Sequence, residues 1–297
     1  MGTQCRVKFR TARVSDATAF QSNLLDWIAN FEATYSRFLP DSVLSRINAN
    51  AGIDWVEIDS ETERLFNLCS QLVFTTRGAF DPTALPLIRL WNWKAERAVI
   101  PSAADIKAAQ QLVGWSRVQR KPGAVFLPQP GMCIDLGGIG KEFAVDCVLA
   151  LALEQGIQNI LVDFGQDVRV HGQPADKPAW HIGLQDPKNP GRCWCGLAVK
   201  NHAVTTSGDY IRSFTLNGIR YGHIIDPRTG YPVSNGCLAV SVMAPSCTVA
   251  GVLSTTAFIL GPQEGISFIS NFLGAEGCVV TDRGTFTTRR FQSYVVS

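Results

Sequence analysis

Residues 135–141 carry the clearest chemical signal, because a carboxylate, Asp135, enters a glycine-dense turn and Lys141 leaves it. Glycine lets the backbone approach a ligand closely, and the first N–H groups of a helix have no partner inside that helix. Such donors, next to a lysine, suit an anion such as a phosphate-bearing ligand. A plain turn before a helix, with Asp135 as its cap, explains the same residues equally well, so both interpretations stay open here.

Five more segments combine glycine or proline with hydroxyls, carboxylates or a histidine. They are residues 78–83, 163–167, 205–210, 223–230 and 250–257. Each has an ordinary structural explanation. A lone strand histidine such as His223 is more often a satisfied core residue, and Thr255 on an apolar helix face commonly bonds back to the preceding turn. The pairs Asp81-Pro82 and Asp226-Pro227 are good turns.

Several classes of protein are excluded by what the sequence lacks. It contains no G-x-S-x-G elbow, Walker loop, H-E-x-x-H or G-x-G-x-x-G, which removes most routine hydrolases, kinases and dehydrogenases. The net charge of +2 argues against a nucleic-acid-binding protein. No apolar run approaches the roughly 20 residues of a membrane span. An apolar content of 46% is that of a globular chain with a sizeable core.

The elements that must position these segments follow from apolar spacing. Helical spacing predicts helices over residues 15–35, 60–77, 102–112, 143–154, 246–260 and 262–272. Strands are expected at 6–10, 125–127, 159–163, 168–170, 181–184, 196–199, 211–216, 220–225 and 238–243, and two more should close the chain. Ser15, Ser60 with Glu63, and Ser102 are expected N-caps. Early helices followed by antiparallel-looking strands predict an α+β fold in one continuous domain, residues 1–297.

In this order the polar segments resemble the ApbE family of flavin transferases. The resemblance runs from Met1 to the helix after Met243 and rests on residues 36–48, 78–91, 135–146, 206–210 and 223–232. It implies a single α+β domain of the T-fold kind. It also implies an FAD:protein FMN transferase, which moves FMN from FAD onto a threonine or serine hydroxyl of a target flavoprotein and releases AMP. A divalent cation, usually Mg²⁺, would sit on the pyrophosphate.

The resemblance also assigns roles to individual residues. FAD contacts would fall on Met1, Phe38, Ala79, Phe80, Asp81, Asp135, Lys141 and Ile225. The metal would be held by the carbonyl of Gly138 and by Ser254 and Thr255 of the helix near residue 251. His223 would act as the base or position the substrate. Phe38 stands where the family commonly has tyrosine, so a stacking ring remains and a hydroxyl is lost.

Three positions depart from the family pattern. Where the family has an alanine–aspartate pair whose aspartate binds the metal, this chain has Ala250-Gly251. We expect this loss to weaken Mg²⁺ binding severely unless another carboxylate, such as Asp167 or Asp226, supplies the charge. Glu142 replaces a glycine after the lysine, where it would favour the helix dipole but repel a phosphate. Gln166 replaces a glycine in the 163–167 turn.

These departures leave alternatives open. The chain could bind FAD with weak or lost transferase activity, could hydrolyse FAD to FMN and AMP as a pyrophosphatase, or could serve as a scaffold. Its nine irregularly spaced cysteines favour a reducing compartment, so we expect a cytoplasmic location. Because many relatives are exported, a periplasmic or membrane-anchored location is the alternative, should an export segment precede the present start.

Overall fold

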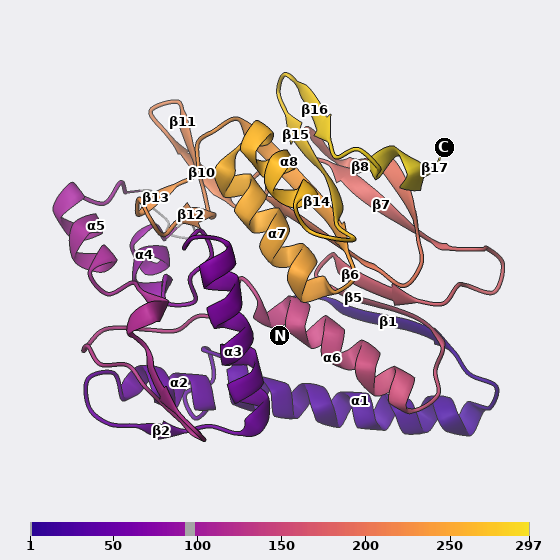
Figure 1. Ribbon diagram of the computed structural model, residues 1–297, viewed down its shortest axis with the longest axis horizontal. Helices are drawn as coiled ribbons and strands as arrows, with labels where there is room; N and C mark the ends of the chain where they lie inside the picture. The colour runs from indigo at the N-terminus through magenta and orange to yellow at the C-terminus, as the bar shows by residue number, and fades with distance from the viewer. Residues whose placement is uncertain (1, 93–98, 297) are drawn as a thin grey trace. The chain divides into compact units, whose positions relative to one another are not determined.

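The computed structural model describes residues 2–92 and 99–296 and divides into two compact units (Figure 1). The first unit comprises Met1–Asn30, Ile139–Tyr210 and Asn235–Ser297, and the second comprises Phe31–Gly138 and Ile211–Ser234. The expected mixture of helices and sheets is confirmed. The assignment of residues 1–297 to one domain stays a prediction. Within the described residues, no helix has both the length and the apolar character needed to span a bilayer.

An antiparallel sheet, seven-stranded within the described residues, forms the frame of the first unit. Its strands in spatial order are β1 (Cys5–Arg10), β5 (Asn159–Phe164), β6 (Asp167–His171), β9 (Ala203–Gly208), β14 (Cys237–Ala244), β15 (Glu276–Thr281) and β16 (Gly284–Thr287). Every residue of β14 is buried, as expected for a strand packed on both faces. Apolar spacing misses β9, because its Thr205, Thr206 and Ser207 interrupt any alternation of apolar and polar residues.

Three helices of the first unit pack on this sheet: α6 (Gly140–Glu154) against β5 and β6, α7 (Cys247–Leu260) against β9 and β14, and α8 (Pro262–Ser270) against β15 (Figure 1). Helix α7 carries no charged residue and buries most of its side chains, so packing rather than amphipathicity holds it. Its cap Ser246 accepts a hydrogen bond from the N–H of Val249. Helices α6 and α7 also contact each other directly.

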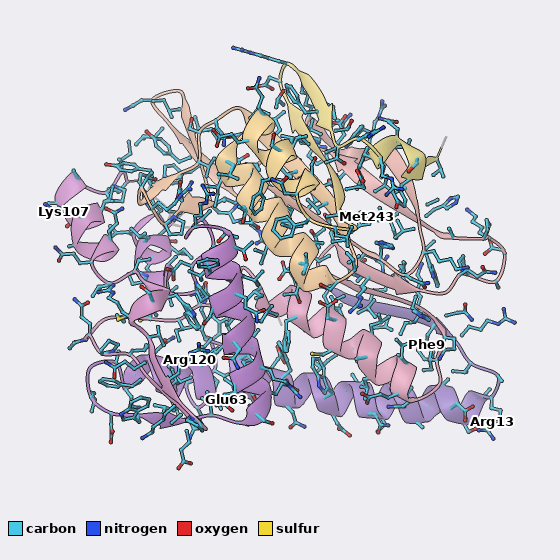
Figure 2. All side chains as sticks on the ribbon, in the orientation of Figure 1. Phe9, Arg13, Glu63, Lys107, Arg120 and Met243 are labelled. Carbon is cyan, nitrogen blue, oxygen red and sulfur yellow. The ribbon has the colours of Figure 1, made fainter. Side chains whose placement is uncertain are left out.

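The first unit also contains a smaller sheet of β7 (Trp180–Asp186), β8 (Asn189–Val199) and β17 (Val295–Val296). A core of buried apolar residues lies beneath it and includes Val168, Leu197 and Met243, the last of which is labelled in Figure 2. This core ties β6 and β14 to the smaller sheet, so the frame behind β9 is well packed.

The second unit holds shorter elements. Helix α1 (Val14–Tyr35) ends in it, and its helices are α2 (Val43–Ala49), α3 (Ser60–Thr75), α4 (Leu85–Leu90) and α5 (Ala103–Gln110). Its strands are β2 (Val56–Glu57), β3 (Gln119–Lys121), β4 (Ala124–Phe126), β10 (Ser213–Leu216), β11 (Ile219–Gly222), β12 (Ile225–Asp226) and β13 (Tyr231–Pro232). Arg120, labelled in Figure 2, ties the β3–β4 hairpin to α3 by donating to Asn67 and Ser70.

Several local predictions are wrong in this region. The short helices α2 and α4 are not predicted from spacing, because six or seven residues give too few turns for a periodic signal. The cap of α3 is Asp59, whose carboxylate accepts from the N–H of Thr62, rather than Ser60. Ser15 lies inside α1 and does not cap it. The predicted Ser102 cap is confirmed, because its hydroxyl accepts from the N–H of Asp105.

Candidate functional site

The first turn of α6 and the start of β6 bring two buried carboxylates to one lysine. The Lys141 ammonium forms ion pairs with Asp167 and, at 3.3 Å, with Oε1 of Glu142. Glu142 is only 7% exposed and Asp167 only 5%. The second oxygen of Glu142, Oε2, is buried and has no hydrogen-bond partner among the described residues. Leaving a charged oxygen buried without a partner is costly, and one lysine neutralises only one of two carboxylates. The cluster therefore places two buried carboxylates beside a single lysine.

Glu142 occupies the space in front of Gly251 on α7. A Cβ atom added at Gly251 would lie 2.6 Å from Cγ of Glu142, 3.1 Å from its Cδ and 3.2 Å from its Oε1. Contacts below 3.0 Å are sterically excluded, so a side chain at 251 and the observed position of Glu142 are incompatible. The two departures from the family pattern are thus one coupled change: the glycine on α7 makes room for the acid on α6.

A cluster of four hydroxyl groups joins α7 to β9. Ser207 Oγ lies 2.8 Å from Ser254 Oγ and 2.9 Å from Thr255 Oγ1, and Thr205 Oγ1 donates to Ser254 Oγ at 3.4 Å. Ser254 also donates to the carbonyl of Gly251 at 2.9 Å, so its oxygen keeps lone pairs as an acceptor. Ser254 and Thr255, predicted as metal ligands, are therefore brought together. Thr205 and Ser207 were missed as site residues, although alternate positions of a strand share one face.

In the second unit, Asp135 does not cap a helix. Helix α6 has Ile139 at its N-cap, without a side-chain capping bond. Asp135 instead accepts from the N–H of Gly137 at 3.1 Å and pairs with Arg37, whose Nε lies 3.1 Å from Oδ1. The Arg37 guanidinium also lies 4.5 Å from the centre of the Phe38 ring. Arg37, which sequence reasoning missed, thus connects two of the predicted FAD contacts within this unit.

The 78–83 and 135–138 segments lie side by side in the second unit, as the predicted site requires. The N–H of Asp135 donates to the carbonyl of Pro82 at 2.7 Å, and a Cβ at Gly138 would lie 3.6 Å from the ring of Phe80. Ala79 and Phe80 are both buried. The Asp81 carboxylate is already bonded, since it accepts from the N–H and hydroxyl of Thr83 and from the N–H of Trp115. Asp81 therefore holds the loop in shape.

His223 stays neutral in the fold. Burial, reinforced by the charge of Arg212, lowers the pKa of the imidazole to about 4. Its Nδ1 lies 3.2 Å from the carbonyl oxygen of Arg212, which can only accept, so Nδ1 carries the proton and Nε2 the lone pair. A neutral imidazole with its lone pair on Nε2 can accept a proton, which is what the predicted role of base requires. That role stays a prediction.

The remaining predicted residues have these positions. Ile225 is buried in a cluster with Leu87 and Trp91 in the second unit. Asp226, considered as a source of metal charge, is paired with Arg228 through contacts of 2.8–3.2 Å. Met1 lies outside the described residues. Lys141, Ser254 and Thr255 belong to the first unit, and Phe38, Ala79, Phe80, Asp81, Asp135, Gly138, His223 and Ile225 belong to the second.

The first unit offers oxygen atoms that fit a hard divalent cation. Over the described part of the chain, no three His, Cys, Asp or Glu side chains gather as a metal-binding group. Magnesium does not need three, because it usually takes one or two protein carboxylates and keeps waters and phosphate oxygens. Glu142 has a buried oxygen without a hydrogen-bond partner among the described residues, and the nearby part of α7 and β9 carries the hydroxyl oxygens of Ser207, Ser254 and Thr255. The residues present therefore fit Mg²⁺.

Comparison with known proteins identifies the family. A sequence profile described as the ApbE family matches residues 1–279. The chain belongs to the ApbE family. It is 30% identical to the FAD:protein FMN transferase of Treponema pallidum, over 94% of this chain and 82% of that protein. With the Vibrio cholerae FAD:protein FMN transferase the identity is 29%, over 90% of this chain and 81% of that protein.

Solved structures of the ApbE family share the fold. The ApbE protein of Thermotoga maritima superposes with a TM-score of 0.89 at 31% identity, covering 100% of this chain and 97% of that one. The flavin transferase ApbE of Vibrio cholerae gives a TM-score of 0.87 at 27% identity, covering 99% and 96%. The expected ApbE architecture is confirmed.

Proposed function

We propose that this protein is an FAD:protein FMN transferase. The observation that carries the proposal is that nearly the whole chain matches ApbE flavin transferases. The first unit supports it with Lys141 and two carboxylates at the start of α6, and with four hydroxyls between α7 and β9. A lysine and oxygen donors at this place suit a pyrophosphate together with its cation.

The reaction is a transfer of a phosphoryl-linked group. The acceptor hydroxyl oxygen of a serine or threonine attacks the phosphorus on the FMN side of FAD, and the bond from that phosphorus to the bridging oxygen breaks. AMP leaves with the bridging oxygen, and the hydroxyl proton passes to a base. His223 is the proposed base, because its neutral imidazole can take up that proton at Nε2.

The FAD contacts are proposed at Met1, Phe38, Ala79, Phe80, Asp81, Asp135, Lys141 and Ile225, as the family resemblance assigns them. Lys141 would place its positive charge against the pyrophosphate. Mg²⁺ is the proposed cation, with Gly138, Ser254 and Thr255 among its ligands, and when bound it would neutralise charge on the pyrophosphate and the leaving AMP.

The partner is a target flavoprotein with an acceptor threonine or serine. The nine cysteines, none of which forms a disulfide in the described structure, support the proposal of a cytoplasmic location.

The test is an assay of AMP release with FAD and Mg²⁺, with and without a flavoprotein domain that carries an acceptor threonine. A transferase releases AMP in proportion to the FMN found on the acceptor by mass spectrometry. AMP and free FMN without an acceptor would identify a pyrophosphatase instead. A yellow protein that releases no AMP would be an FAD-binding protein, and the transferase proposal would then be wrong.

A further inference from the structure

Glu142 and Gly251 are in contact, and both residue types are unusual for their positions. Glu142 places a buried carboxylate beside a second one, Asp167, with a single lysine between them. A glycine at 251 lies in the interior of α7, where glycine is about 1 kcal/mol less favourable than alanine. Neither choice stabilises the isolated fold, which points to a ligand.

The contacts around Glu142 do not satisfy its charge. Oε1 accepts from Lys141 at 3.3 Å, but Lys141 also pairs with Asp167. Oε2 is buried and has no hydrogen-bond partner among the described residues, in a side chain that is only 10% exposed. A purely structural glutamate in a first helical turn would sit in solvent and interact with the helix dipole. A buried carboxylate oxygen without a partner is costly, and a bound cation would supply the partner that Oε2 lacks.

The position of Glu142 relative to α7 is well determined by packing. Its Cγ, Cδ and Oε1 fill the space in front of Gly251, where a side chain of α7 would begin. One turn further along α7 lie Ser254, which donates to the carbonyl of Gly251, and Thr255. The carboxylate of α6 thus reaches the same part of α7 from which an aspartate at 251 would extend.

We propose that Glu142 is a carboxylate ligand of a divalent cation in this protein, and that it replaces from α6 the side chain that Gly251 does not provide from α7. Asp167 supplies a second negative charge, and the hydroxyl oxygens of Ser254 and Thr255 complete an all-oxygen donor set. This inference deepens the proposed function and rests on it for the reaction that the cation serves.

The direct test is binding of Mn²⁺ alone, measured by the loss of the free Mn²⁺ electron paramagnetic resonance signal on the full chain. Glu142→Gln keeps the size of the side chain and removes its charge, so we expect binding to weaken roughly 10–100-fold. Glu154→Gln, at the exposed end of the same helix, is the matched control and should bind as the wild type does.

The double variant Glu142→Gly with Gly251→Asp tests the replacement itself. It returns the carboxylate to α7 and opens the space that the aspartate needs, so it should recover most of the Mn²⁺ affinity lost in Glu142→Gln. Far-UV circular dichroism and a urea transition on each variant separate loss of the ligand from loss of the fold. Unchanged Mn²⁺ binding in Glu142→Gln, equal weakening in Glu154→Gln, or no Mn²⁺ binding by the wild type would each overturn the proposal.

The two proposals fail differently. If the wild type releases no AMP from FAD while Glu142→Gln still weakens Mn²⁺ binding, the cation site stands and the transferase proposal falls. If AMP release is normal in the wild type and Glu142→Gln binds Mn²⁺ unchanged, the transferase stands and Glu142 is not a ligand.

Discussion

Two carboxylates lie one turn apart on α6, and both face α7, Asp146 at the start of that helix and Glu142 about one turn further along it. Asp146 accepts four hydrogen bonds: from Arg169 at 2.7 Å, from the N–H groups of Cys247 and Thr248 at 2.8 and 2.9 Å, and from the Thr248 hydroxyl at 2.7 Å. Glu142 accepts only from the adjacent lysine, and its Oε2 has no partner in the described part of the protein.

The contrast separates a structural acid from a binding acid. Asp146 satisfies the first N–H groups of α7 and so fixes the start of that helix against α6. Glu142 lies against the middle of α7, at a glycine that leaves it room and offers it no donor. A buried carboxylate whose oxygens all have hydrogen-bond partners in the protein, such as Asp146, stabilises the fold. A buried carboxylate with an unpartnered oxygen, such as Glu142, is a candidate for binding a ligand.

The largest expected change in stability comes from removing Asp146, the carboxylate with four hydrogen bonds. Asp146→Ala should lower the free energy of unfolding by about 3 kcal/mol, because it leaves the N–H groups of α7 and the Arg169 charge without their acceptor. Urea denaturation in a chelating buffer measures it. Glu142→Gln in the same buffer should change stability by less than about 1 kcal/mol, since no strong contact is lost. Similar losses in both variants would remove the distinction between the two acids.

His223 is a third buried titratable group, and its surroundings favour the neutral form of the imidazole. Its folded pKa of about 4 lies below the ordinary value of 6.5, so between these pH values the unfolded chain binds more protons than the folded one. Stability is therefore lost as the pH falls from 6.5 towards 4, by on the order of 2 kcal/mol after allowance for solvent screening. Urea midpoints across this range should fall less steeply in His223→Gln; parallel curves would contradict a depressed pKa.

The single variant Gly251→Asp probes how tightly Glu142 fills its place. The new Cβ would lie 2.6 Å from Cγ of Glu142, so we expect a loss of about 1–2 kcal/mol from overpacking and from two acids brought together. Adding Glu142→Gly should restore stability in thermal unfolding. A stable single variant would show that Glu142 can move aside at no cost, which would weaken the argument for coupled positions.

The smallest effect is expected in the turn that leads to Asp167. Gly165 and Gln166 form the two-residue connection between β5 and β6, and both have positive φ, 61° and 72°. Glutamine is strained there, so Gln166→Gly should stabilise the fold by about 0.5–1 kcal/mol. A rise in melting temperature with unchanged Mn²⁺ binding would show that this turn affects the stability of the fold but not the affinity for the cation. A fall would mean that the glutamine side chain makes a stabilising contact.

The long elements were predictable because their patterns repeat. Helix α6 and helix α7 were expected within three residues of their observed ends, and the strands of the large sheet other than β9 were expected as strands. Strand β9 was missed because hydroxyl residues hide the alternation, and α2 and α4 because they are too short to show a period. Of the two interpretations of Asp135 that the sequence left open, the helix cap is not observed, because this carboxylate pairs with Arg37 and accepts from the N–H of Gly137.

The sequence by itself determined the family, most of the long helices and strands, and the fact that an acid is missing at 251 and an extra one is present at 142. These are local or pattern properties, carried by residue types and their spacing. Only the tertiary structure decided that the two changes belong together, because residues 109 positions apart meet only when α6 packs on α7. Steric exclusion at Gly251 exists only in that packed state, as does the burial of Glu142 Oε2 without a partner among the described residues.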